Sequence, residues 1–259
     1  MGTFTFFGAL VLIFIVASKK YYLGLSIPGI TTPISPQQRA ILRQHFDFYN
    51  RLPVRSKKLF EKRLSRFMES KTFVPRDLDK VTEEMRVLIS ATAIQLCFGL
   101  AWINLKYFRF IIIYPEAFYS TAGQNYHYGE VNPKHRAIVL SWRNFISGLI
   151  VKDGRNLGLH EMAHALRLEN VIRNGEQHFL DRRALQSWEA LATEEIMRMR
   201  NQEAGFFRDY AATDHAEFFA VAVENFFERP EDFHTYDPKL YRLMCILLNQ
   251  DPRKLDRNL

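Results

Sequence analysis

The chain has 259 residues, of which 47% are apolar and 24% are charged, and its formal net charge is +7. These values are typical of a globular protein and exclude a wholly disordered chain. The chain contains only 12 glycines and two cysteines, which excludes a collagen-like chain and a disulfide-based scaffold.

The basic excess lies near the N-terminus. Residues 1–18 carry no charged side chain, and residues 19–72 hold 12 basic and 3 acidic residues. Residues 73–259 hold 23 basic and 25 acidic residues, so this larger part is slightly acidic. We therefore do not expect it to bind nucleic acid. The basic stretch follows an apolar segment, which favours a membrane surface as its partner.

Residues 1–20 are predicted to anchor the chain in a membrane. The uncharged run of 18 residues is followed by Lys19 and Lys20. As a helix it would be about 27 Å long, close to the ~30 Å hydrocarbon core of a bilayer. A cleaved signal peptide is the alternative, but it usually has a basic residue before its apolar run. Because the positive charge follows the run, we expect the rest of the chain in the cytoplasm, at a bacterial inner membrane.

Residues 21–37 are rich in proline and glycine and are interpreted as a linker to a domain over residues 38–259. Ser35 and Pro36 are a typical N-cap and first residue of a helix, and apolar spacing predicts helix over residues 36–70. Basic side chains in this helical part form either a solvated face or a surface for anionic lipid. They are Arg51, Arg55, Lys57, Lys58, Lys62, Arg63 and Arg66.

The apolar stretch from Val87 to Leu105 is a second candidate for a membrane span. Polar residues within it and charged residues before it favour a buried helix of the domain core instead. Residues 108–114 and 137–142 are predicted strands, and the chain after Asn156 is predicted to form helices separated by loops. Strands followed by helices indicate an α+β domain, mainly helical with a small mixed sheet.

The segment from His160 to His164 reads HEMAH and matches the HExxH pattern. Two histidines four residues apart lie on one face of a helix, so both imidazoles can bind one zinc ion. Glu161 lies beside them and can act as a general base toward a zinc-bound water. The surrounding residues are mostly apolar and predict a buried helix, in which a histidine pair needs a partner such as a metal.

A catalytic zinc ion needs a third protein ligand. No histidine follows His164 at a short distance, so the candidate is a glutamate on the later helix from Asp214 to Glu228. Glu217 is either this ligand or the capping-box partner of Asp214. Glu224 lies seven residues further on among apolar residues. We expect it to be buried and paired, for example with a ligating histidine.

Several motifs occur in one order along the chain: IIIYPEAF, IVLSW, DGRNLGLHEMAHALRLE, DYAATDHAEFFAVAVENFFERPEDF and LYRLMCILLNQDP. Together they resemble the Mlc titration factor A family of zinc-dependent peptidases. The resemblance covers roughly residues 75–255 and implies a zincin-like metallopeptidase domain. It further implies that His160, His164 and Glu217 bind the zinc ion and that Glu161 is the base.

The same family distantly resembles the catalytic domain of anthrax lethal factor, in which a tyrosine seven residues before the glutamate ligand assists catalysis. Tyr210 has that position here, and a tyrosine packed at a helix end is the alternative. Members of the family usually have Asp three residues after the second histidine, where it supports a metal ligand. This chain has Arg167 there, so another carboxylate, such as Glu224, would have to take that role.

The resemblance implies hydrolysis of peptide bonds by a zinc-activated water, in a gluzincin-like site with aminopeptidase action as one form. The predicted strand at residues 137–142 is expected to hold a peptide or protein substrate by strand addition. The alternative is a non-catalytic or weakly catalytic protein that sequesters a transcriptional regulator, because the family name refers to such a partner.

Overall fold

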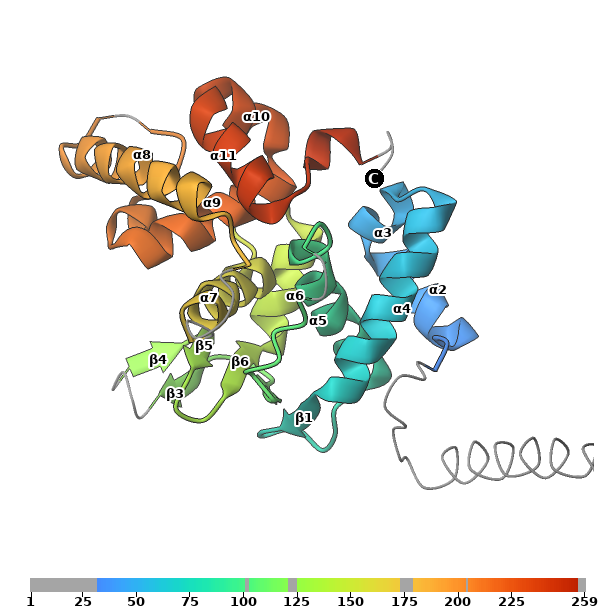
Figure 1. Cartoon of the computed structure of the whole chain (residues 1–259). Coiled ribbons are helices and arrows are strands. Elements are labelled where there is room, and N and C mark those ends of the chain that lie inside the picture. Colours follow the sequence, from blue (N-terminus) through green and yellow to red (C-terminus); the bar gives the residue numbers. More distant parts are fainter. Residues whose placement is uncertain (1–31, 101–102, 121–124, 173–178, 204, 256–259) are drawn as a thin grey trace, which may run out of the picture. The chain divides into compact units, whose positions relative to one another are not determined.

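The computed structural model describes residues 32–100, 103–120, 125–172, 179–203 and 205–255 (Figure 1). By its internal contacts the chain divides into two units, Met1–Pro33 and Ile34–Leu259. The predicted anchor at residues 1–20 and most of the predicted linker lie outside the described residues. Within the described part of the chain, no helix has both the length and the apolar character needed to span a membrane.

The N-terminal part of the second unit contains three helices, α2 (Pro36–His45), α3 (Asp47–Arg51) and α4 (Val54–Ser70). The first begins where the sequence predicts, because Ser35 and Gln38 form a reciprocal capping box. The predicted helix over residues 36–70 is not continuous, however. Its backbone is extended at Phe46, between α2 and α3, and Pro53 interrupts it before α4, since proline lacks a backbone N–H group and disfavours helical dihedral angles in the residue before it.

Four short strands form a mixed sheet in the order β1-β2-β6-β5. They are β1 (Thr72–Pro75), β2 (Phe110–Tyr114), β6 (Ala137–Ser141) and β5 (Gly129–Asn132). β1, β2 and β6 run parallel, whereas β5 is antiparallel to β6. In the register of the sheet, Ile111 lies between Phe73 and Ile138. The two predicted strands are therefore confirmed as the central pair, β2 and β6. A separate hairpin consists of β3 (Phe118–Ser120) and β4 (Asn125–His127).

The other helices follow the predicted alternation of helices and loops. They are α5 (Glu83–Leu96), α6 (Trp142–Ile150), α7 (Leu157–Ile172), α8 (Arg182–Arg200), α9 (His215–Glu228), α10 (Pro230–Tyr236) and α11 (Pro238–Leu248), with the 3-10 turns η1 (Asp209–Ala212) and η2 (Pro252–Lys254). The predicted α+β class, mainly helical with a small mixed sheet, is thereby confirmed. Both cysteines, Cys97 and Cys245, are free thiols.

The apolar stretch from Val87 belongs to the domain core, as predicted. It forms α5, which starts at the Thr82 cap and is buried over most of its length, but the helix already ends at Leu96. Gly99 follows, and a side chain there would collide with the backbone carbonyl of Asn249. Glycine at this position permits the close approach of the Asn249 backbone.

The core places one helix between the sheet and a second buried helix. α7 contacts α5 and α9, and it also contacts β5 and β6 (Figure 1). α9 is buried from Phe218 to Phe227, so it is apolar around most of its circumference. Polar side chains on α7 and α9 at this interface therefore need partners from the other helix or from the edge of the sheet.

Candidate metal centre

The HExxH residues lie on α7, and the turn before the helix fixes its start. Gly154 has φ +80°, a conformation that favours glycine. Asn156 caps the helix, because its side chain accepts a hydrogen bond of 2.9 Å from the backbone N–H of Leu159. One turn separates His160 from His164, and their Nε2 atoms are 3.1 Å apart. The two imidazoles therefore converge on one point.

Glu217 brings a carboxylate to the same point from α9. Asp214 caps α9 by accepting hydrogen bonds from the backbone N–H groups of Ala216 and Glu217, which leaves the Glu217 carboxylate for the histidines. Oε2 of Glu217 is 3.1 Å from Nε2 of His160 and 3.4 Å from Nε2 of His164. One ligand atom from each of the three side chains lies within 4.8 Å of the others. The structure thus brings the three predicted metal ligands together.

Glu224, also on α9, orients His160. Its Oε1 atom accepts a hydrogen bond of 2.7 Å from Nδ1 of His160. That bond leaves Nε2 of His160, which faces Glu217, as the nitrogen that can bind a metal. Oε2 of Glu224 accepts a bond of 2.5 Å from the backbone N–H of Asn156. Glu224 therefore fixes both the histidine and the start of its helix.

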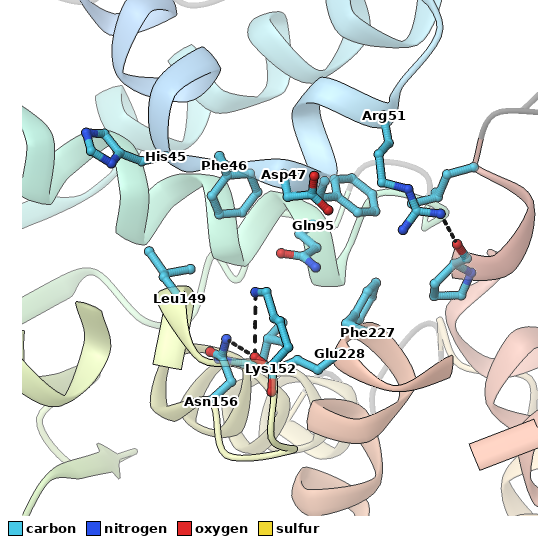
Figure 2. Close-up of a pocket in the computed structure, with 14 residues that line it drawn as sticks. His45, Phe46, Asp47, Arg51, Gln95, Leu149, Lys152, Asn156, Phe227 and Glu228 are labelled. Carbon is cyan, nitrogen blue, oxygen red and sulfur yellow. Dashed lines mark hydrogen bonds and ion pairs between the residues drawn. The ribbon is translucent and has the colours of Figure 1, made fainter. Parts of the chain in front are cut away.

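A third carboxylate of α9, Glu228, holds the turn before α7. Figure 2 shows Asn156 and Lys152 directed at this carboxylate. Oε1 of Glu228 accepts a hydrogen bond of 2.9 Å from Nδ2 of Asn156, and Oε2 accepts one of 3.0 Å from the backbone N–H of Gly154. A cavity of about 70 Å³ lies beside these residues, and none of the three predicted metal ligands lines it. This cavity is thus not the metal site but a space behind the start of α7.

Glu161, the predicted base, is buried against the edge of the sheet. It packs on Gly129, the first residue of β5, where an added Cβ atom would lie 2.6 Å from Cδ of Glu161. Burial raises the pKa of Glu161 to about 7, although the nearby His160 and His164 act in the opposite direction. A carboxyl group with a pKa near neutrality is well suited to proton transfer.

Tyr210 lies in η1 beside His160. Its ring centroid is 6.0 Å from that of His160, and the residue is 51% exposed. This exposure disfavours a role as a packed tyrosine. Partial burial and the Glu217 carboxylate raise the pKa of Tyr210 to about 12, so its hydroxyl keeps its proton at neutral pH. A protonated hydroxyl can donate a hydrogen bond to negative charge that develops on a substrate.

The electrostatics of the three ligands fit a divalent cation. Burial by itself lowers the pKa of His160, but the approach of Glu217 and Glu224 outweighs burial and raises the pKa to about 10. Burial raises the pKa of Glu217, but His160 and His164 more than reverse this, and the net pKa lies well below its usual range. Oε2 of Glu217 is buried, and neither histidine contact has the geometry of a hydrogen bond. Two imidazoles and an incompletely satisfied carboxylate are a typical ligand set for zinc.

Arg167 stands where the resemblance leads one to expect Asp. Its Nη2 donates a hydrogen bond of 3.0 Å to Glu189 on α8, and its guanidinium lies 5.2 Å from the centre of the Phe219 ring. Arg167 therefore packs between helices. The carboxylate that supports a predicted metal ligand is Glu224 on α9, as the sequence suggests.

The strand expected to receive a substrate is not at an edge of the sheet. β6 pairs with β2 on one side and with β5 on the other, so its backbone groups are already used. The prediction for residues 137–142 is therefore wrong. The edge beside α7 is β5, which also carries Gly129 against Glu161. An extended peptide can add only to such an open edge.

Three residues that shape this site were not among the candidates from sequence: Gly129, Glu228 and Arg208, whose guanidinium donates hydrogen bonds to the Glu224 carboxylate. A glycine within a strand pattern signals a close approach of another group, and the YHYGEV segment around Gly129 contains that signal. Arg208 and Glu228 have no comparable signal. Each is a single charged residue whose partner becomes known only when the helices are packed.

Two histidines and a glutamate converging beside a buried glutamate form the arrangement of a metallopeptidase site. The family model of the glucose-regulated metallopeptidases M90 matches residues 30–247. This chain therefore belongs to the M90 family of metallopeptidases.

Individual relatives agree with this assignment. Mlc titration factor A of Escherichia coli (strain 55989 / EAEC) is 30% identical over 208 residues, which are 72% of this chain and 76% of that protein. Mlc titration factor A of Cronobacter sakazakii is 30% identical over 213 residues with the same shares. An uncharacterized protein of Synechocystis, slr2042, is 27% identical over 228 residues, 82% of this chain and 83% of that protein. The resemblance seen in the sequence motifs is thus confirmed.

Proposed function

We propose that the protein is a zinc-dependent peptidase with a gluzincin-like site on a zincin-like domain. The observation that carries this proposal is the convergence of His160, His164 and Glu217 next to the buried carboxyl of Glu161. Membership of the M90 family supports the metallopeptidase class. Zinc held by these three residues would supply a Lewis acid that polarises a carbonyl group and acidifies water.

The protein's own side chains carry the proton transfers. Glu161 takes a proton from the attacking water and returns it to the leaving amine, a role that suits a carboxyl group buried beside the predicted ligands. Tyr210 keeps its proton and donates a hydrogen bond to the charge that develops on the substrate's carbonyl oxygen. Glu224 keeps His160 in the orientation that presents Nε2 to the metal.

In this proposal the peptide substrate pairs with β5, the edge strand of the sheet beside α7. A peptide that adds to this edge by backbone hydrogen bonds passes Gly129, where the base is seated. Tyr128 directly precedes Gly129 and is 58% exposed, so its ring is available to a side chain of the substrate. Such backbone pairing would accept peptides of varied sequence, and the exposed ring would add a preference for apolar side chains.

A second candidate function is the binding of a transcriptional regulator without cleavage. The observation that favours it is the name of the relatives that are 30% identical, Mlc titration factor A. In that role, the three ligands would hold a structural metal. The two candidates differ in one respect that can be measured: only a peptidase consumes its partner.

The location that we propose is a bacterial inner membrane, with residues 1–20 as anchor and the domain in the cytoplasm. The surface of α4 supports this. Val54 and Leu59 are 72% and 49% exposed, and Arg55, Lys58 and Lys62 are also exposed. Exposed apolar and basic side chains on one helix suit contact with anionic lipid.

Part of the basic cluster has a different role. Arg63 turns into the protein and donates hydrogen bonds to the backbone carbonyls of Cys97 and Phe98. Only the exposed basic residues of α4 are therefore available to lipid.

The proposed activity is tested with a peptide library and the full-length chain purified in mild detergent. Peptides with free and with blocked N-termini separate aminopeptidase from endopeptidase action. We expect cleavage that a chelator abolishes and added zinc restores, and we expect His164→Ala to lose both zinc and cleavage. If the zinc-loaded protein leaves every peptide intact, the peptidase proposal fails and the binding function takes its place.

A further inference from the structure

Arg208 makes a two-pronged contact with the carboxylate that orients His160. Its Nη2 donates a hydrogen bond of 2.7 Å to Oε1 of Glu224, and its Nη1 donates one of 2.9 Å to Oε2. Nη1 also donates a hydrogen bond of 2.8 Å to the backbone carbonyl of Gly154, in the turn before α7. One guanidinium group therefore binds both oxygens of Glu224 and the turn that starts the HExxH helix.

These bonds complete the surroundings of the Glu224 carboxylate. Oε1 accepts from His160 and Arg208, while Oε2 accepts from the backbone of Asn156 and from Arg208. A carboxylate has about four acceptor positions, so each is occupied. With all positions used and only 1% of its surface exposed, Glu224 cannot rotate without breaking a bond.

We propose that Arg208 is a positioning residue of the metal centre. It locks the plane of the Glu224 carboxylate so that Oε1 faces Nδ1 of His160, and this directs Nε2 of His160 to the metal. The inference rests on the proposed zinc site but not on peptide cleavage. Nothing in the family match or in the HExxH pattern assigns this role to Arg208.

The geometry requires the fork of an arginine and not only its positive charge. A guanidinium has parallel N–H groups that match the two oxygens of a carboxylate, whereas an ammonium group is a single point charge. A lysine at this position could neutralise Glu224 but could not hold both oxygens and the Gly154 carbonyl together. A merely charge-balancing role would therefore tolerate lysine, and a positioning role would not.

Arg208 also borders the residue proposed to assist the reaction. It directly precedes η1, and its guanidinium carbon lies 5.8 Å from the centre of the Tyr210 ring. The same side chain thus contacts the support of His160 and packs near Tyr210. Although Arg208 lies in a loop and its side chain is 24% exposed, its guanidinium contacts Glu224, the Gly154 carbonyl and the Tyr210 ring.

The experiment compares Arg208→Lys with Arg63→Lys in the full-length chain. Arg63 is the matched control, because it is a half-buried arginine that also donates to backbone carbonyls but touches neither Glu224 nor a predicted ligand. Zinc affinity is measured by competition with a chromophoric chelator. The ring nitrogen of His160 that binds zinc is read from its ¹⁵N chemical shifts in the zinc-loaded protein, and thermal unfolding reports on stability.

We expect Arg208→Lys to weaken zinc binding by about 10–100-fold, the usual effect of losing a residue that supports a metal ligand. In the zinc-loaded variant, the ¹⁵N signals of His160 should show a mixture of zinc bound through Nε2 and through Nδ1. Arg63→Lys should lower thermal stability and leave both readouts unchanged. In a Glu224→Gln background, Arg208→Lys should add little further loss, because the two residues act through one contact.

Unchanged zinc affinity, with zinc bound through Nε2 of His160 alone, in Arg208→Lys would overturn the proposal and leave charge balance as the role of Arg208. Arg208→Gln provides a second variant if the lysine variant does not fold, since its amide can still donate one bond to Glu224. If neither variant folds while Arg63→Lys does, Arg208 is a residue of the folded core and the proposal is again overturned.

Discussion

Gly129 and Glu161 are in direct contact: the carboxyl of Glu161 packs on the backbone of β5 at the one position without a side chain. The contact joins the HExxH helix to the open edge of the sheet. It places the proposed base next to the strand proposed to bind the substrate. Gly129 therefore belongs both to the seat of the base and to the edge that binds the peptide.

Replacing Gly129 with alanine should displace the base while the fold is retained. The three atoms nearest the added Cβ atom would be Oε1, Cδ and Cγ of Glu161, which belong to one flexible side chain, so Glu161 can move aside. We expect peptide hydrolysis to fall on the order of 100-fold, as for other small displacements of a catalytic group, with zinc content unchanged. Gly205→Ala is the control, because its Cβ would lie 3.6 Å from the nearest atom. Equal rates of peptide hydrolysis in the two variants would contradict the proposal that Gly129 leaves the space in which Glu161 is seated.

Replacing Glu224 with glutamine should weaken zinc binding. The amide can no longer accept from every donor around it, so the orientation of His160 is lost and affinity should fall by about 10–100-fold. Competition with a chelator measures this. Glu195→Gln is the matched control, since Glu195 on α8 is equally buried and pairs with Arg198 of the same helix and with Tyr236 of α10. Glu195→Gln should lower the stability of the fold and leave zinc affinity unchanged. A similar loss of zinc affinity in both variants would contradict a specific role of Glu224.

Zinc binding should release a proton. The pKa of His160 without metal is about 10, so the imidazole is protonated at pH 8, where the lower pKa of Glu161 leaves that carboxyl largely ionised. A metal needs the neutral imidazole, and each bound ion should therefore release about one proton from His160. Affinity should rise roughly tenfold for each pH unit up to about pH 10. Calorimetry at pH 8 in buffers of different ionisation enthalpy measures the release, and a pH-independent affinity would contradict it.

The N-terminal segment should hold the chain in membranes during alkaline extraction. Residues 1–18 contain no charge, so we expect the full chain in the pellet and a variant without residues 1–20 in the wash. Release of the full chain would contradict the anchor. In the shortened variant, Lys58→Glu with Lys62→Glu should reduce binding to vesicles that contain anionic lipid. Vesicles of neutral lipid serve as the control.

The metal ligands could be predicted because their signals are local. His160 and His164 are one helical turn apart, and the apolar residues around Glu224 already indicate a buried, paired carboxylate. The role of Glu217 was ambiguous from spacing alone, because a glutamate three residues after Asp214 also fits a capping box. The resemblance to a known family favoured ligation, and the structure places its carboxylate at the histidines.

The edge of the sheet could not be predicted in the same way. β5 has only four residues, GEVN, with no alternation of apolar side chains, and its position depends on pairing with β6. The prediction of strand addition falls instead on β6, which is internal. Arg208 was missed for a related reason: its partner is 16 residues away and meets it only through the packing of α9.

The most direct test of the account is the rate of peptide hydrolysis by Glu161→Gln at a zinc content equal to that of the wild type. The amide keeps the shape of the side chain but cannot accept the proton of the attacking water. We predict stoichiometric zinc in both proteins and a loss of about 10²–10⁴-fold in the rate for the variant. Hydrolysis by Glu161→Gln at the wild-type rate, with zinc bound, would contradict the assignment of Glu161 as the base and with it the proposed mechanism.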